Sequence, residues 1–238
     1  MSKIKLFCFP YAGGSAVIFN KWKEFIDSEI ELVPIELAGR GKRINEPLYQ
    51  NASALIDDIY EIVSNMIDDS PFALFGHSMG SMISYQLCQK LRENNYPIPL
   101  HVFFSGRSAP HIKKPDEKKY HLLGEEEFKK EVLNLGGTPP EFFDHHELLE
   151  LFLPLLKNDF KLAETDIHNG EIFPLNNSIS IFLGKDEDLT IEQCEGWKKH
   201  TNNLCSIYYF EGGHFFLHRE IKQIVQLINQ TLLNYVFV

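Results

Sequence analysis

Short apolar runs alternate with amphipathic stretches along most of the chain. Near-continuous apolar runs, typical of strands buried on both faces of a parallel sheet, lie at residues 4–9, 30–37, 72–75, 100–104, 179–183 and 206–210. Stretches with apolar residues at helical spacing lie at 18–26, 52–67, 82–91, 191–200 and 220–234. Strand, helix and strand in this order predict right-handed crossovers, and therefore an α/β fold with a mostly parallel central sheet.

The alternation stops between residues 107 and 174, where the pattern contains no convincing strand. Helical spacing is found there only at 125–135, 144–156 and 159–166. Segments of this length without a strand are uncommon unless they serve a function. We therefore expect one domain over 1–238, with a helical lid inserted over the carboxyl-terminal edge of the sheet.

The composition of the chain limits which kinds of ligand it could bind and indicates the cellular compartment. The chain has 238 residues, 44% of them hydrophobic, and a formal net charge of -10, which argues against a nucleic-acid ligand. No stretch approaches the length of a signal peptide or a membrane span. The four cysteines are scattered without metal-site or C-x-x-C spacing, as in a reduced protein. These features predict a cytoplasmic protein that binds neither nucleic acid nor membrane, and we expect a monomer.

The run at 72–75 leads directly into Gly76-His77-Ser78-Met79-Gly80, which fits the G-x-S-x-G nucleophile elbow. A strand that turns at once into a helix leaves no room for side chains beside the serine. The elbow predicts Ser78 as a nucleophile at a helix N-terminus, where the N–H groups favour negative charge.

A serine needs a general base, and ten histidines compete for the role. His214 follows the last predicted strand, which is the position of the base in an α/β-hydrolase. His77 lies inside the elbow, with its side chain expected to point away from the nucleophile. His145 and His146 lack the H-E-x-x-H spacing of a metal site, and Asp144 with Glu147 is better explained as a helix capping box.

The acid should follow a strand that lies between the nucleophile and the base in sequence. The strand before Ser105 and Gly106 carries no carboxylate at its end, whereas the strand ending at Gly184 is followed by three acidic residues. We predict Asp186 as the acid that orients His214, with Asp188 as the alternative.

Two backbone N–H groups should stabilise the oxyanion. One belongs to Met79, which follows the nucleophile. The other should come from the loop after the first strand, where Pro10 ends the strand and Gly13 lets the backbone approach the substrate. We nominate the N–H of Tyr11.

Several motifs together resemble one family. They are Phe9-Pro-Tyr-Ala-Gly-Gly-Ser15, Ala38-Gly-Arg-Gly41 with Arg43 and Glu46-Pro47, Gly76-His-Ser-Met-Gly80, Ser105-Gly-Arg-Ser-Ala-Pro-His111, Leu135-Gly-Gly-Thr138 and Gly212-Gly-His214. In this combination the chain resembles, nearly end to end, the stand-alone type II thioesterases that edit nonribosomal peptide and polyketide synthesis.

The resemblance implies an α/β-hydrolase fold and hydrolysis of acyl or aminoacyl thioesters on the phosphopantetheine arm of carrier proteins. It implies the triad Ser78, Asp186 and His214 with oxyanion donors Tyr11 and Met79, no cofactor and no metal. The partners would be acyl or peptidyl carrier protein domains of a synthetase. One departure is Leu155-Leu-Lys-Asn-Asp-Phe160, where the family commonly has Leu-Arg-Ala-Asp.

The lid would then line an acyl and pantetheine channel. Its apolar residues cover too wide an arc for a simple surface helix. They are Leu148, Leu149, Leu151, Phe152, Leu153, Leu155 and Leu156. Packing of the lid on the body explains most of these leucines equally well. Arg107, Lys113, Lys114, Lys118 and Lys119 form a basic cluster for an acidic carrier protein or an ordinary solvated surface.

Two other functions fit parts of the pattern. A small-molecule carboxylesterase or lipase would use the same triad, since this chemistry is indifferent to whether oxygen or sulfur leaves. A non-catalytic module that binds carrier proteins would be expected to lack a triad residue, and none is missing from the sequence.

Overall fold

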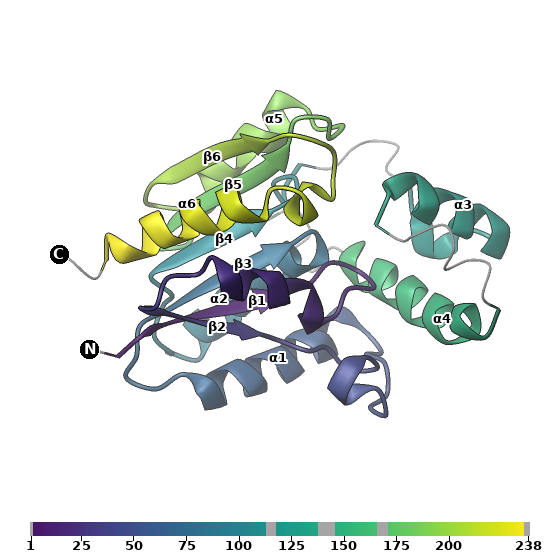
Figure 1. The fold of residues 1–238 in the computed structure, drawn as a ribbon, viewed down its shortest axis with the longest axis horizontal. Helices are drawn as coiled ribbons and strands as arrows, with labels where there is room; N and C mark the ends of the chain where they lie inside the picture. Colours follow the sequence, from purple (N-terminus) through teal and green to yellow (C-terminus); the bar gives the residue numbers. More distant parts are fainter. Residues whose placement is uncertain (1, 113–117, 138–145, 166–170, 236–238) are drawn as a thin grey trace.

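The computed structural model describes residues 2–112, 118–137, 146–165 and 171–235. Six strands form one sheet in the order β2-β1-β3-β4-β5-β6, and every neighbouring pair is parallel (Figure 1). The strands are β1 Ile4–Phe9, β2 Ile30–Pro34, β3 Phe72–His77, β4 His101–Ser105, β5 Ser178–Gly184 and β6 Cys205–Phe210. The predicted parallel α/β architecture is confirmed.

Helices cover both faces of this sheet. The α-helices of the body are α1 Ala52–Met66, α2 Met79–Glu93, α5 Ile191–Glu195 and α6 Ile221–Leu233. The 3-10 helices are η1 Ala16–Glu24, η2 Gly41–Arg43, η3 Tyr120–Leu122, η5 Gly196–His200 and η6 Phe216–His218. Apolar residues of α1, α2, α5 and η5 form one core, and those of η1 and α6 form the other.

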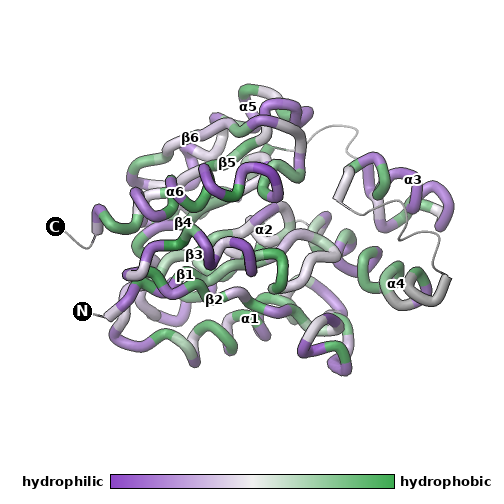
Figure 2. Tube along the Cα trace, in the orientation of Figure 1, coloured by the Kyte–Doolittle hydropathy of each residue, from purple (hydrophilic) through white to green (hydrophobic). Residues whose placement is uncertain are grey.

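The first strand shows why its apolar run is continuous. Phe7 and Phe9 belong to the core beneath α1 and α2, whereas Leu6 and Cys8 belong to the core beneath η1 and α6. A strand between two helical layers needs apolar residues on both faces. Helix α1 instead alternates between hydrophobic and hydrophilic residues in Figure 2, as expected for a helix with one face in the core.

One stretch with helical spacing forms a tighter helix than expected. The segment predicted at 18–26 is the 3-10 helix η1, whose buried side chains Phe19 and Trp22 lie three residues apart. This spacing matches the three residues per turn of a 3-10 helix, so both rings face the sheet.

The segment between β4 and β5 contains η3 and two further helices, α3 Glu125–Leu135 and α4 His146–Ala163. Both α-helices lie beyond the carboxyl-terminal ends of the strands (Figure 1). The prediction of separate pieces at 144–156 and 159–166 was wrong, because α4 is one helix that continues across residues 157 and 158. Pro154 is exposed while Leu155, Leu156 and Leu162 are buried, so both halves of the helix pack against other parts of the protein.

Parts of the predicted lid fall outside the described residues. These are Lys113, Lys114, Thr138, Asp144, His145 and Asp166, together with the side chains of His146, Glu147, Leu148 and Leu151. Within the described ranges, no helix is long and apolar enough to cross a membrane.

Candidate active site

Ser78 occupies the sharp turn between β3 and α2. Its backbone has φ 56 and ψ -110, a conformation that L-residues rarely adopt. Its N–H donates a hydrogen bond of 2.7 Å to the carbonyl of Ser105 at the end of β4. Neighbouring strands therefore hold the turn in place, as the elbow motif predicts.

The two glycines of the elbow are required by close backbone contacts. A Cβ on Gly76 would lie 1.9 Å from the carbonyl oxygen of Gly80, and a Cβ on Gly80 would lie 2.1 Å from the carbonyl oxygen of Phe9. The start of α2 is thus pressed against the end of β1. This contact places Ser78 and Met79 beside the loop that carries Tyr11.

His214 lies in the loop between β6 and η6 and is held by a carboxylate. Its Nδ1 is 2.7 Å from Oε1 of Glu187, whose side chain is only 6% exposed. The other carboxylate oxygen of Glu187 accepts a 2.7 Å hydrogen bond from the Gly184 N–H. A carboxylate on Nδ1 keeps the proton there and leaves Nε2 free to act as a base.

The structure places a different carboxylate against His214 from the one predicted. Asp186 and Asp188 are exposed, and the backbone N–H of Asp186 donates to the carbonyl of Gly212 at 3.1 Å. The contact with His214 that was expected from Asp186 is made by Glu187. The chain turns back after Gly184, so the third residue beyond it, and not the second, faces the base.

Close packing of two loops brings Glu187 and His214 together. A Cβ on Gly184 would lie 2.5 Å from the carbonyl oxygen of Gly212 and 2.6 Å from that of Gly213. Glu187 is the middle one of the three acidic residues that follow Gly184, and this contact was not predicted for it. The missed signal was its spacing, since a carboxylate three residues after a strand-ending glycine can bond back to the glycine N–H.

The loop after β1 has four amides that could face a substrate. The Gly13 N–H donates to the carboxylate of Asp159 at 2.7 Å, and the Gly14 N–H donates to the carbonyl of Tyr11 at 2.9 Å. For the amides of Tyr11 and Ala12, no acceptor is found among the described residues. The hydroxyl of Tyr11 lies 3.0 Å from Nε2 of His218, which connects this loop to the segment carrying His214.

His77 lies buried beside the base. Its ring centre is 5.1 Å from that of His214, and its Nδ1 is 2.8 Å from the hydroxyl of Ser105. Burial and the nearby His214 and His218 hold the pKa of His77 well below its usual value. A Cβ on Gly106 would lie 2.6 Å from this ring, so the glycine makes room for it. His77 is therefore a neutral packing partner of the base.

An apolar cavity of about 140 Å³ lies between the loop after β1 and the helices that follow β4. Its lining residues are Tyr11, Ala12, Gly13, Val132, Leu135, Gly137, Phe152, Leu156, Phe160 and Phe215. Residues from α3 and α4 form one wall, and residues next to the predicted oxyanion donor and the base form the other. The cavity suits an apolar group attached to a reacting carbonyl.

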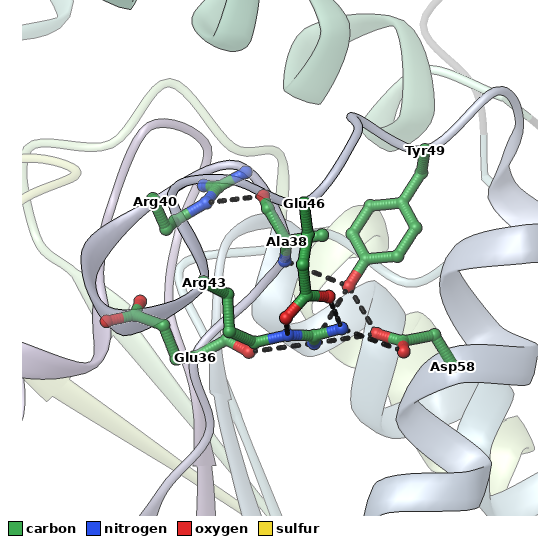
Figure 3. Close-up of polar contacts among 7 residues, drawn as sticks. All are labelled: Glu36, Ala38, Arg40, Arg43, Glu46, Tyr49 and Asp58. Carbon is green, nitrogen blue, oxygen red and sulfur yellow. Dashed lines mark hydrogen bonds and ion pairs between the residues drawn. The ribbon is translucent and has the colours of Figure 1, made fainter.

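A polar cluster holds the loop between β2 and α1 (Figure 3). Arg43 binds the carboxylates of Glu46 and Asp58, and the Tyr49 hydroxyl donates to Asp58 at 2.5 Å while it accepts the Ala38 N–H at 3.1 Å. Burial and the hydrogen bond to Asp58 raise the pKa of Tyr49. The pKa of Asp58 is lowered because hydrogen bonds from Arg43 and Tyr49 outweigh its burial. Part of the Ala38–Pro47 motif therefore has a structural role.

Comparison with known proteins identifies the family. The family model described as a thioesterase domain matches residues 4–232. This chain belongs to the thioesterase family. The enzyme is a thioester hydrolase with an α/β-hydrolase fold.

Several proteins that are similar to this thioesterase are named for biosynthetic pathways or products. The gramicidin S biosynthesis protein GrsT of Aneurinibacillus migulanus is 35% identical over 97% of this chain and 90% of its own. A Brevibacillus parabrevis protein called linear gramicidin dehydrogenase LgrE is 38% identical over 98% and 89%. The crystal structure of ClbQ, from the colibactin NRPS/PKS pathway, has a TM-score of 0.91 with 32% identity and covers 98% of both chains.

One of these relatives is called a dehydrogenase, but the loop after β1 in this thioesterase lacks the glycine motif of a dinucleotide-binding site. A dinucleotide-binding strand and helix would be joined by G-x-G-x-x-G, whereas this chain has Pro10-Tyr-Ala-Gly-Gly-Ser-Ala16. The elbow and the base–acid pair, in contrast, are complete. Within the described residues, no cluster of three His, Cys, Asp or Glu side chains could hold a metal ion.

The described members of the predicted basic cluster are engaged within the thioesterase itself. Arg107 donates to the carbonyl of Ala163 at 2.8 Å, Lys118 pairs with Glu131 at 2.8 Å, and Lys119 donates to the carbonyl of Glu164 at 3.2 Å. These contacts favour a role in holding α3 and α4 to the body.

Where the family commonly has arginine, Lys157 donates to the carbonyl of Leu123 at 3.0 Å. Its ammonium also lies 5.3 Å from the ring centre of Phe128. Lys157 therefore joins α4 to the segment that contains η3 and α3. At this departure from the family pattern, a cation of α4 contacts α3 and the segment before it.

Proposed function

We propose that this thioesterase hydrolyses acyl or aminoacyl thioesters on the phosphopantetheine arm of carrier proteins. In this role it removes mis-primed groups during nonribosomal peptide or polyketide synthesis. The observation that carries the proposal is the Ser78 elbow beside the Glu187–His214 pair, next to an apolar cavity walled by α3 and α4. Relatives that act in such pathways support the same conclusion.

In the proposed reaction His214 Nε2 takes the proton of the Ser78 hydroxyl as its oxygen attacks the thioester carbonyl carbon. Backbone N–H groups, which we assign to Tyr11 and Met79, stabilise the resulting oxyanion. The C–S bond breaks, and His214 returns the proton to the departing thiol. A water molecule then attacks the acyl-serine carbonyl carbon as His214 takes its proton. The bond from this carbon to the Ser78 oxygen breaks, His214 returns the proton to that oxygen, and the carboxylic acid leaves.

Glu187 supports each step by holding the His214 ring and stabilising its protonated form. The chemistry uses side chains and amides of this chain alone, and the phosphopantetheine arm belongs to the substrate. The walls of the cavity favour an apolar acyl group over a charged one, because a charge would lose its hydration there.

The test is to incubate the protein with carrier proteins that carry acetyl, aminoacyl and longer acyl groups, and with a simple ester of the same acids. We expect faster release from carrier proteins than from the ester, and loss of release in Ser78→Ala. Faster turnover of the ester would favour a carboxylesterase. Binding of loaded carrier protein without any release would indicate a non-catalytic module.

A further inference from the structure

Asp159 in helix α4 is fully buried and has two partners from the body of the protein. Its Oδ2 lies 2.6 Å from Nη1 of Arg40 and accepts the Gly13 N–H at 2.7 Å. Its Oδ1 accepts from Nη2 of Arg40 at 2.8 Å. The contact is a two-pronged pair of an arginine and a carboxylate, and it joins segments 119 residues apart in sequence.

Arg40 extends the contact to the other end of the same turn. Its Nη1 also donates to the carbonyl of Gly14 at 3.1 Å, and its own side chain is 6% exposed. The pair thus binds the N–H of Gly13 and the carbonyl of Gly14. Gly13 has φ 77, so this turn adopts a backbone conformation that few residues other than glycine reach.

Helix α4 also packs on this turn through apolar side chains. A Cβ on Gly13 would lie 2.7 Å from Cδ1 of Leu156 and 2.9 Å from the ring of Phe152. Leu156 and Phe152 line the apolar cavity. One face of α4 therefore supplies the wall of the cavity and the carboxylate that binds the turn.

The buried ion pair of Arg40 and Asp159 lies where apolar residues could also pack. Two charges removed from water are often no more stabilising than well-packed apolar residues of similar volume. Leucines and phenylalanines of α4 already supply apolar contacts to the loop. Apolar residues cannot accept a hydrogen bond from the Gly13 N–H or donate one to the Gly14 carbonyl. The ion pair does both, and it thereby fixes the direction of each peptide group.

We propose that Arg40 and Asp159 are positioning residues for the oxyanion site. By binding Gly13 and Gly14 they set the turn that presents the amide of Tyr11, and they make α4 and this loop one unit. The inference rests on the proposed function, because it assumes that the loop stabilises an oxyanion during attack by Ser78.

The test compares two double variants that both lack the ion pair. Arg40→Met with Asp159→Asn keeps a carbonyl oxygen that can accept the Gly13 N–H, whereas Arg40→Met with Asp159→Leu removes it. Removing both charges together avoids leaving one charge buried and unpaired. Each protein is assayed on an acyl thioester of a small thiol, with Ser78→Ala as the blank and thermal unfolding as the check on folding.

We expect the leucine variant to lose about 10²-fold in kcat relative to the asparagine variant, with KM changed less than about three-fold, because the lost interaction acts on the transition state. Equal kcat in the two folded variants would overturn the inference. If wild type itself shows no more turnover than Ser78→Ala on any ester or thioester, the proposed function fails instead.

A second measurement needs no variant. In wild-type protein labelled with ¹⁵N-glycine, the buried bond to Asp159 predicts strong protection of the Gly13 amide from hydrogen exchange. Exchange of this amide at the rate of an exposed glycine would overturn the inference even if the leucine variant failed to fold.

Discussion

Glu187 bonds His214 and the strand end with the same carboxylate: one oxygen is 2.7 Å from Nδ1 of His214, and the other accepts the Gly184 N–H at 2.7 Å. The bond from the Gly184 N–H orients the carboxylate independently of His214. A glutamate is longer than an aspartate, and here its extra length is taken up by the turn back to the strand.

This arrangement predicts opposite outcomes for two neighbouring acids. Glu187→Gln should lower kcat by about 10²- to 10⁴-fold, because the amide no longer selects the correct tautomer or stabilises protonated His214. Asp186→Asn is the matched control and should stay within about two-fold of wild type, since surface substitutions away from such contacts have small effects. Steady-state kinetics on one thioester would measure both, and a larger loss in Asp186→Asn would restore Asp186 as the acid.

Gly80→Ala should lower both activity and stability. The added Cβ would lie 2.1 Å from the carbonyl oxygen of Phe9 and 2.9 Å from that of Pro10, so the start of α2 must move away from the loop after β1. A displacement of about 1 Å in a catalytic site can cost about 10²-fold in rate. Gly124→Ala is the control, because nothing lies within 4 Å of its added Cβ. Wild-type kcat in Gly80→Ala would contradict the described elbow.

His101 should make stability depend on pH. It is buried in β4, and burial lowers its pKa to about 4, below the ordinary value of 6.5. The unfolded chain then binds a proton that the folded chain does not, so stability is complete above pH 6.5 and falls as pH drops toward 4. The expected loss from this group is roughly 3 kcal/mol.

The check on this group is urea unfolding from pH 4 to 7. His101→Gln cannot titrate and should show a smaller loss of unfolding free energy over this interval than wild type. His77, whose pKa is also lowered, is present in both proteins and drops out of the comparison. Identical pH profiles would show that His101 is not the titrating group.

Tyr49→Phe should destabilise the protein by about 1–3 kcal/mol, because it leaves the buried N–H of Ala38 without its partner and removes a hydrogen bond from Asp58. Urea unfolding at neutral pH measures the change. Tyr208→Phe is the control, since the described part of the chain shows no hydrogen bond of its hydroxyl. Equal stability of the two variants would mean that the cluster in Figure 3 contributes little.

The strands and the sharp turn at Ser78 were predictable because their causes are local. The apolar run at β1 reflects burial on two faces, and the glycines around Ser78 reflect contacts within a few residues and with the neighbouring strand. The position of His214 in the loop after β6 was predictable from its place after the last apolar run. The continuation of α4 across residues 157 and 158 was not, because it depends on residues such as Asp159 and Leu162 that are buried against the rest of the protein.

The acid and the contact of α4 with the catalytic loop depend on tertiary structure. Three acidic residues follow β5, and only the packing of Gly184 against Gly212 and Gly213 decides which one faces His214. Arg40 and Asp159 carry no local pattern that pairs them across 119 residues. By itself, the sequence determined the α/β fold, the elbow and the position of His214. Hydrophobic periodicity and the steric demands of a turn depend on residues that are close together in the sequence. The acid and the Arg40–Asp159 pair were decided by how distant loops pack at one edge of the sheet, which no short stretch encodes.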